Sequence, residues 1–537
     1  MIHTLSKHIK LAGIIAATVL VTSCDKEILD VTPYDAFTDA TAFSSPERCL
    51  LAMNGTYDAA QSGFYLNGTV RGYPFGAANI EQGDMRGEDM LNQAAFYQIT
   101  YEATYNDVSA NNVFHFQTLY SLINKANLTI EGVRAAGAKG TITAELASQY
   151  EAESRFLRAL AHHELVLHFA RPYADGNGSQ TGIIYREFGI NSESTAEAAR
   201  ALTRATVADN YTKILADLDY AETNLPATTT LKTFRASKAA AIALKMRVKQ
   251  AKGDWAGVIT EGNKLVPAGS APYVSPIGGW KLTATPGGAF VAPWQSDESI
   301  FSIKNDATDN PGVNGSLPNM LGNPSAAPVG VGGRGLVRIS PVIWNASFWL
   351  CDDVRRTGLT SSDGGAGRYT TKYKDVTTQA DAAPQIRYAE VLLMLAEAEA
   401  RSSATVSQRG LDLLNAVRNR ALADVANQAY TLASFATKND LVQAILNERR
   451  IEFLAEGKRW FDISRLAKDA DFAPVAGGGI PSKVGSGAAT AAMFNCAAPP
   501  AFNRSVPAIP YSSNRFIWPI PIVEIQQNPN FTQNPGY

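Results

Sequence analysis

Apolar residues recur every three or four positions over several long stretches of the 537-residue chain, which is the spacing of α-helices with one buried face. The pattern predicts helices at residues 112–136, 144–170, 207–224, 237–251, 254–265, 389–401 and 406–420. Only Lys252 and Gly253 separate the fourth of these helices from the fifth. So short a connection makes two helices run antiparallel and pack on each other. The pattern therefore predicts an all-α fold built from helical pairs.

The pairs carry alanines at their expected contact points and resemble tetratricopeptide repeats, although they keep no strict period. Stacked pairs bury a continuous core and leave one curved face. Residues 60–110, 266–383 and 470–517 break the pattern and are irregular, and the last two are rich in Gly, Pro, Ser and Asn. Irregular segments of this length are uncommon in a compact protein and are usually functional, and their Trp, Phe and Ile residues argue against disorder. We expect these excursions to be ordered and to serve a function.

Two segments in the C-terminal part predict helices with defined ends. RYAEVLLMLAEAEA from Arg387 predicts a helix that begins near Pro384 and has one apolar stripe. NERRIEFLAEGKRWFDISR from Asn447 predicts a helix that ends at Gly457, because glycine tolerates positive φ, followed by a new helix from Lys458.

The last twenty residues, WPIPIVEIQQNPNFTQNPGY, contain four prolines. Proline removes a backbone donor and fixes φ, so this segment is not expected to form a regular helix or a central strand. It predicts an extended tail that packs on a preformed surface through Trp518, Ile520, Ile522 and Phe531.

These three segments, together with SRFLRALAHHELVLHFARPY from Ser154, resemble the SusD/RagB family of surface nutrient-binding lipoproteins. The resemblance is specific at the C-terminus and looser before about residue 140. It implies an α-helical receptor without catalytic activity that sits over an outer-membrane transporter. It also implies that the ligand site lies in excursions from a helical repeat scaffold.

The N-terminus has the pattern of a bacterial lipoprotein signal. Lys7 and Lys10 precede an apolar run at residues 11–21 that is too short to span a bilayer as a helix. Small residues then precede Cys24, as in a lipoprotein cleavage box. Acyl chains on Cys24 would contribute about 0.8 kcal/mol per buried CH₂ to membrane binding. We predict a signal peptide at residues 1–23 and a lipidated tether at 24–41, the alternative being an ordinary secretory signal with a chance cysteine.

Charge and cysteine content exclude some classes of protein. Removal of residues 1–23 takes away two lysines and leaves 46 basic and 50 acidic residues, a net charge of −4. Nucleic-acid binding requires a basic patch, so we predict no nucleic-acid partner. With Cys24 acylated, Cys49, Cys351 and Cys496 remain, which permits at most one disulfide. The absence of a C-x-x-C pair excludes a zinc ribbon.

Catalytic motifs are incomplete. His163 and His168 nearly form H-E-x-x-H, but they lie five residues apart, so the side chains diverge by about 140° around a helix. A G-x-G-x-x-G match at residues 330–335 precedes a strand-like run rather than a helix, which is the wrong context for a dinucleotide site. Asp352 and Asp353 are adjacent and so project differently, and sequence cannot show the carboxylate spacing of a glycosidase. We predict no catalytic residues, no cofactor and no metal.

Aromatic side chains in the excursions are the candidate ligand contacts. A sugar ring offers an apolar C–H face to an aromatic ring and hydroxyls to polar side chains. The candidates are Trp280, Trp294, Trp344, Trp349, Tyr65, Arg71, Tyr73 and Phe75. The alternative is that these rings anchor the loops to the helices, because buried tryptophan is mostly structural.

The resemblance implies a surface-exposed, lipid-anchored protein of the outer membrane that captures oligosaccharides and delivers them to a SusC-like TonB-dependent transporter. The alternatives are a RagB-like peptide receptor, a surface glycoside hydrolase and a scaffold that binds only protein. We expect one compact unit, with a SusD-like N-terminal region at 42–225 and a SusD/RagB C-terminal region at 226–537.

Overall fold

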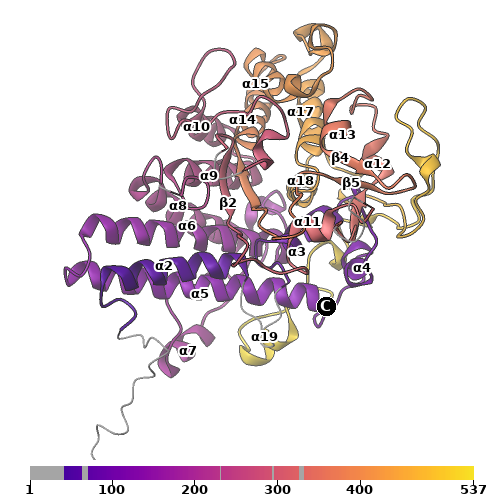
Figure 1. Ribbon diagram of the computed structural model, residues 1–537. Helices are drawn as coiled ribbons and strands as arrows, with labels where there is room; N and C mark the ends of the chain where they lie inside the picture. Colours follow the sequence, from indigo (N-terminus) through magenta and orange to yellow (C-terminus); the bar gives the residue numbers. More distant parts are fainter. Residues whose placement is uncertain (1–40, 63–70, 230, 293–295, 326–331) are drawn as a thin grey trace, which may run out of the picture.

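The computed structural model describes residues 41–62, 71–229, 231–292, 296–325 and 332–537 (Figure 1). Ten helices form the main body: α2 (Pro46–Gln61), α5 (Ala110–Ala138), α6 (Ala144–Phe169), α8 (Val207–Asn224), α9 (Lys238–Ala251), α10 (Trp255–Leu265), α14 (Tyr388–Ser402), α15 (Gln408–Arg418), α17 (Lys438–Glu452) and α18 (Arg459–Leu466). The seven helices predicted from apolar periodicity all form, with each end within two residues of its predicted position.

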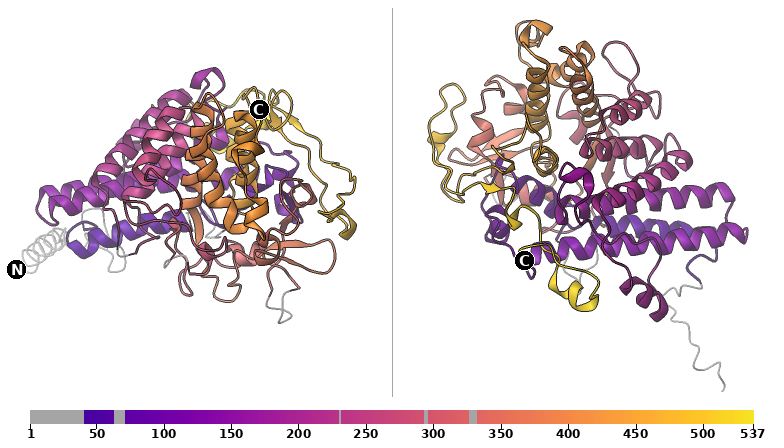
Figure 2. Two further views of the ribbon diagram at one scale, coloured as in Figure 1. Left: turned by 90° about the horizontal axis from the view of Figure 1, so that it is seen from above. Right: turned by 180° about the vertical axis from the view of Figure 1, so that it is seen from behind.

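The long helices pack on one another in chain order. α5 packs on α6, α6 on α8, α8 on α9, α9 on α10 and α10 on α14, which in turn contacts α15 and α17. In Figure 1 and in both views of Figure 2, α5 and α6 project from one side of the molecule, and part of the yellow C-terminal segment loops out from the opposite side. This stack of helical pairs confirms the predicted all-α, tetratricopeptide-like scaffold.

Local capping explains why the helix ends were predictable. Ser45 accepts a hydrogen bond from the backbone of Arg48 at the start of α2, where Pro46 occupies the first helical position. Thr206 and Asp209 form a reciprocal capping box at the start of α8. Such caps satisfy backbone N–H groups that have no partner within the helix, and the residues responsible lie within one turn of each other.

The excursions, the other connections between the main helices and the C-terminal tail carry short elements. Their helices are α3 (Ala77–Met85), α4 (Ala95–Tyr101), α7 (Glu193–Arg200), α11 (Leu317–Leu321), α12 (Pro341–Trp344), α13 (Val354–Gly358), α16 (Val425–Gln428) and α19 (Ile522–Gln527). Their strands are β1 (Met90–Asn92), β2 (Ser299–Ile303), β3 (Val337–Ile339), β4 (Thr360–Ser362), β5 (Arg368–Thr370), β6 (Ala383–Arg387), β7 (Gly479–Ile480) and β8 (Ile509–Pro510). Among the described residues these strands form four antiparallel pairs, β1–β3, β2–β6, β4–β5 and β7–β8.

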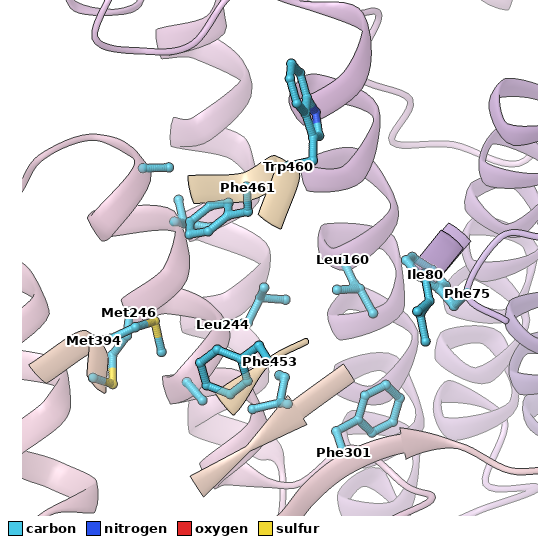
Figure 3. Close-up of a cluster of buried hydrophobic side chains, with 14 of the residues drawn as sticks. Phe75, Ile80, Leu160, Leu244, Met246, Phe301, Met394, Phe453, Trp460 and Phe461 are labelled. Atoms are coloured by element: carbon cyan, nitrogen blue, oxygen red, sulfur yellow. The ribbon is translucent and has the colours of Figure 1, made fainter. Parts of the chain in front are cut away.

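A hydrophobic core joins the helical stack to the excursions. Figure 3 shows Ile80 of α3 and Leu160 of α6 near Phe301 of β2, with Met246 of α9 beside Met394 of α14. Burial of such side chains is the main favourable contribution to folding. The excursions are therefore part of the folded body, as expected from their apolar residues.

Two predicted helix boundaries were wrong. Pro384 does not begin a helix but lies in β6, opposite Ser302 of β2, and α14 starts four residues later at Tyr388. The helix before Gly457 ends at Glu452, and Ala455 and Gly457 both adopt positive φ in the turn that leads to α18. The pairing of β6 with β2 and the turn at Ala455 and Gly457 both depend on residues distant in the sequence. A periodic pattern of apolar residues does not reveal such partners.

The C-terminal tail packs as predicted but contains one helix that was excluded. Trp518, Ile520 and Phe531 are buried, whereas Ile522 is half-buried. Between Pro521 and Pro529 the chain forms the short helix α19, because seven residues without proline leave room for its six. The tail is pinned by Asn534, whose Nδ2 donates 2.8 Å hydrogen bonds to the carbonyls of Phe169 and Trp518.

Buried ion pairs hold the C-terminal half together. Arg387 donates to Glu456 at 2.8 Å and to Glu452 at 3.0 Å, and its side chain is 2% exposed. On α14, Glu390 pairs with Arg247 at 2.8 Å. Charged groups in the protein interior require such partners. The residues that carry the family resemblance are thus joined by buried charges as well as by apolar packing.

Cysteine pairing agrees with the count from the sequence. Cys351 and Cys496 form a disulfide, and Cys49 is a buried free thiol. Within the described part of the chain, no helix is long and apolar enough to cross a membrane. Cys24 and the signal and tether at residues 1–41 fall almost wholly outside the described residues, and the predicted domain boundaries stay predictions.

Candidate functional site

A groove of about 210 Å³ lies where two excursions meet. The strand pair β1–β3 places Met90 opposite Ile339 and Asn92 opposite Val337, which joins the 71–101 segment to the 314–339 segment. The groove is lined by Arg71, Ala94, Phe96, Tyr97, Asn314, Met320, Arg334 and Leu336. Aromatic, amide and guanidinium groups therefore converge on one hollow.

Arg71 holds its guanidinium close to two aromatic rings. The centre of the guanidinium lies 5.2 Å from the ring of Phe96 and 5.1 Å from the ring of Phe114. Cation–π contact with both rings restrains the side chain. Its Nε is buried and has no hydrogen-bond partner among the residues that the structure describes. A restrained guanidinium with unused donors is suited to bind an oxygen-rich ligand.

Arg334 lines the same groove from the second excursion. Its Nη1 donates a 2.7 Å hydrogen bond to Asn314 Oδ1 and contacts Met320 Sδ at 3.7 Å. Its backbone N–H donates to the carbonyl of Asn319 at 2.6 Å. The side chain is exposed, so it can reach a ligand in the groove.

Glu81 of α3 is a fully buried carboxyl near the groove residues. Burial raises the pKa of Glu81 from 4.5 to about 8, against the opposing effects of a hydrogen bond from Tyr97 and the charge of Arg334. Glu81 is therefore protonated, and neutral, at neutral pH.

The raised pKa predicts a stability effect. Between pH 4.5 and 8 the folded protein keeps the Glu81 proton that the unfolded chain releases, so the free energy of unfolding falls as pH rises across this window. The full loss is on the order of 5 kcal/mol. We expect Glu81→Gln to flatten the fall, as measured by urea denaturation at pH 5, 6.5 and 8. Parallel pH profiles for both proteins would contradict the assignment.

The sequence-predicted candidates in the first excursion divide between surface and interior. Arg71 lines the groove. Tyr73 and Phe75 are buried, and the hydroxyl of Tyr73 accepts a 3.0 Å hydrogen bond from Gln82. In this conformation their rings pack inside the protein. Tyr65 lies outside the described residues.

The three candidate tryptophans that the structure describes, Trp280, Trp344 and Trp349, do not line the groove. Trp280 and Trp349 are buried, at 0% and 2% exposure, and Trp294 lies outside the described residues. Trp344 is half-buried, with its ring centroid 5.6 Å from that of Trp349 and 6.1 Å from that of Phe494. The structure therefore brings Trp344 and Trp349 together but joins neither to Arg71.

The surroundings of Trp344 leave little of its ring free. The guanidinium centre of Arg356 lies 4.7 Å from the ring centroid and that of Arg368 lies 5.6 Å away. Arg356 in turn donates to the carbonyls of Trp344 and Trp349 at 2.8 and 2.7 Å. These contacts anchor loops, which is the structural alternative considered for the aromatic residues.

Phe96, Asn314 and Arg334 are groove residues that the sequence did not reveal. The signal for Arg334 was the glycine-rich stretch at 330–335, which predicted a loop and is followed by the predicted short strand, β3. Phe96 and Asn314 have no distinctive local pattern. Their placement depends on pairing between segments more than 200 residues apart.

The histidines form a cluster that the motif search did not anticipate. His115 of α5 joins Glu164 and His168 of α6, with ligand atoms within 4.8 Å of one another. His168 Nε2 lies 3.1 Å from Glu164, and Arg86 Nη1 lies 3.0 Å from His168 Nδ1. Because a guanidinium only donates, Nδ1 accepts and the ring proton is on Nε2, where it blocks metal binding. We interpret the cluster as a hydrogen-bonded network, and the prediction of no metal stays a prediction.

The stack of helical pairs with a groove built by its excursions defines a helical-repeat binding scaffold. Residues 359–537 match the model of the SusD family, and residues 29–249 match a model described as starch-binding associating with outer membrane. SusD-like protein P38 of Formosa agariphila is 22% identical over 518 residues, which covers 86% of this chain and 92% of the relative. The chain belongs to the SusD family, which confirms the resemblance seen in its sequence.

Solved structures share the fold. A SusD superfamily protein from Bacteroides fragilis aligns with a TM-score of 0.72 at 26% identity, covering 91% of this chain and 99% of that one. Surface glycan-binding protein A from Bacteroides thetaiotaomicron, solved in complex with laminarihexaose, aligns with a TM-score of 0.65 at 16% identity over 91% of this chain and 99% of that one.

Proposed function

We propose that this protein is a glycan-binding lipoprotein of the outer membrane. It captures an oligosaccharide in the groove lined by Arg71, Phe96, Asn314 and Arg334, and delivers it to a SusC-like TonB-dependent transporter. The protein binds its ligand and does not alter it.

The observation that carries the proposal is the combination of groups in the groove. Phe96 offers an aromatic ring to the C–H face of a sugar. Arg71, Arg334 and Asn314 offer donors, and in Asn314 also an acceptor, to its hydroxyl groups. Few, convergent polar groups in a partly apolar hollow are typical of a small-molecule binding site.

Related proteins support the same class of ligand. The Bacteroides thetaiotaomicron protein was solved with laminarihexaose, and another neighbour is described as a laminarin-binding SusD-like protein. The family description of outer-membrane association supports the proposed location. The SusC-like partner and the peptide-binding alternative are carried by the family resemblance alone.

Arg71→Ala is expected to weaken glycan binding by about 2 kcal/mol, or roughly 30-fold in Kd. The substitution removes the hydrogen-bond donors of the guanidinium together with its restrained positive charge. Isothermal titration against a panel of oligosaccharides and peptides measures the effect. Lys139→Ala is the control, since Lys139 caps the far end of α5 and is exposed. Unchanged affinity in Arg71→Ala, or binding of peptides and of no glycan, would overturn the proposal.

The lipid anchor is tested separately from the ligand site. Cys24→Ser removes the thiol that would carry the acyl chains, so we expect the protein to move from the membrane fraction to the soluble fraction of lysed cells. Stable anchoring requires at least two lipid chains or an equivalent second signal. Retention of Cys24→Ser in the membrane would show that another segment attaches the protein.

A further inference from the structure

The described residues that line the groove include two cations, Arg71 and Arg334, and no Asp or Glu. Among the residues that the structure describes, neither Arg71 nor Arg334 takes part in an ion pair. In the sequence, the segments just before these arginines, 63–70 and 326–331, contain no Asp or Glu. Elsewhere, Arg387 and Arg450 each contact two or more carboxylates.

The buried carboxyl near the groove does not supply the missing charge. Glu81 interacts with Arg334, but burial raises its pKa to about 8, so the group is neutral at neutral pH. Within the described part of the chain, the two guanidinium groups therefore have no carboxylate that pairs with them.

The geometry favours an anionic partner over a neutral one. The guanidinium of Arg71 lies 5.2 Å from the ring of Phe96 and 5.1 Å from that of Phe114, and its Nε is buried with no hydrogen-bond partner among the described residues. A partly desolvated cation gains more from a charged acceptor than from a hydroxyl. The planar guanidinium also matches the two oxygens of a carboxylate or of a sulfate ester.

We infer that the groove selects acidic glycans, in which a sugar carries a carboxylate or a sulfate ester that is bound by Arg71 and Arg334. This inference rests on the proposed glycan-binding function and specifies its substrate class. The neutral parts of the same glycan then lie against Phe96 and Asn314.

Matched ligands test the charge alone. Oligogalacturonate and its fully methyl-esterified form share one skeleton and differ in charge, and a sulfated carrageenan oligosaccharide tests the other anion. By isothermal titration we expect at least one acidic oligosaccharide to bind about tenfold or more tightly than the methyl ester and than laminarihexaose. Comparison of the affinities for oligogalacturonate and for the carrageenan oligosaccharide shows whether a carboxylate or a sulfate ester is preferred. The preference should shrink as salt increases, because exposed charges are screened.

Substitutions of the two arginines test whether the preference for acidic glycans arises in this groove. Arg334→Gln and Arg71→Gln should each reduce the ratio of acidic to neutral oligosaccharide affinity at least about fivefold. Arg334 is exposed, so its substitution does not threaten folding. Lys139→Ala removes the same charge at the other end of α5, about 37 Å along the helix from Phe114, and should leave the ratio unchanged.

The outcomes separate the two proposals. Equal or tighter binding of the neutral oligosaccharides overturns this inference but leaves glycan binding intact. A preference for acidic glycans that survives in both arginine variants also overturns it, since the anion would then bind elsewhere. Binding of no glycan in the panel, or of acidic peptides in their place, refutes the proposed function as well.

Discussion

Arg387→Met is expected to lower the free energy of unfolding by about 3–5 kcal/mol. Arg387 is buried and contacts the carboxylates of Glu298, Glu452 and Glu456. Arginine partners, Arg420 and Arg387 foremost, hold the pKa of Glu452 at about 2 although burial opposes this. Methionine fills a similar volume but leaves three buried carboxylates short of a cation. Chemical denaturation of the variant and the parent protein measures the loss.

The control for this prediction is the same substitution in an exposed pair. Arg200 contacts Glu193 at 3.5 Å, and both side chains are about half or more exposed. Arg200→Met should change the free energy of unfolding by less than about 1 kcal/mol, because exposed ion pairs contribute little. Equal effects of the two variants would show that the buried network around Arg387 does not have the role assigned here.

Trp518→Ala is expected to destabilise the protein by about 3–5 kcal/mol, because it empties a fully buried site in the core. The indole stacks on His168 with ring centroids 4.5 Å apart and meets the edge of Phe169 at 5.6 Å. The guanidinium centre of Arg86 lies 5.0 Å from the ring. Loss of the indole should release the C-terminal tail as well as lower stability.

Chemical denaturation and limited proteolysis measure the two effects of Trp518→Ala. The matched control is Val523→Ala, in the same tail but 36% exposed, which should change stability by less than about 0.5 kcal/mol. A tail that resists protease in Trp518→Ala as well as in the parent protein would show that other contacts suffice to hold it.

The scaffold was predictable because its signals are local. Helix α8 has the predicted ends, since Thr206, Asp209 and the apolar stripe lie within the helix or next to it. The same reasoning failed at Pro384, where strand pairing with residues about 80 positions away decides the structure. Local signals define helices in this chain, and distant contacts define the short strands and turns.

Buried charge was the main property of the scaffold that sequence periodicity missed. A single apolar stripe was predicted for α14, yet Glu390 and Glu397 are buried as well, because Arg247 and Arg465 pair with them. These partners lie 143 and 68 residues away in the sequence. A helix buried on all sides with paired charges looks amphipathic in sequence, so the periodic pattern understates its burial.

The candidate site was predicted in part. Arg71 was selected because it stands among aromatic residues in an irregular segment, and it lines the groove. Trp280 and Trp349 met the same criterion but fill space beneath the loops. A large aromatic side chain in a loop is as suited to anchoring the loop as to contacting a ligand, and only its burial distinguishes the two.

The most direct test of the central claim is to recover the ligand after binding. The purified protein is titrated with an oligosaccharide that it binds, incubated for hours, and the ligand is then released and analysed by mass spectrometry and by a reducing-end assay. We predict saturable binding that depends on Arg71, with the recovered oligosaccharide unchanged in mass and no increase in reducing ends. Shorter fragments or new reducing ends, formed in proportion to protein concentration, would contradict a role in capture alone.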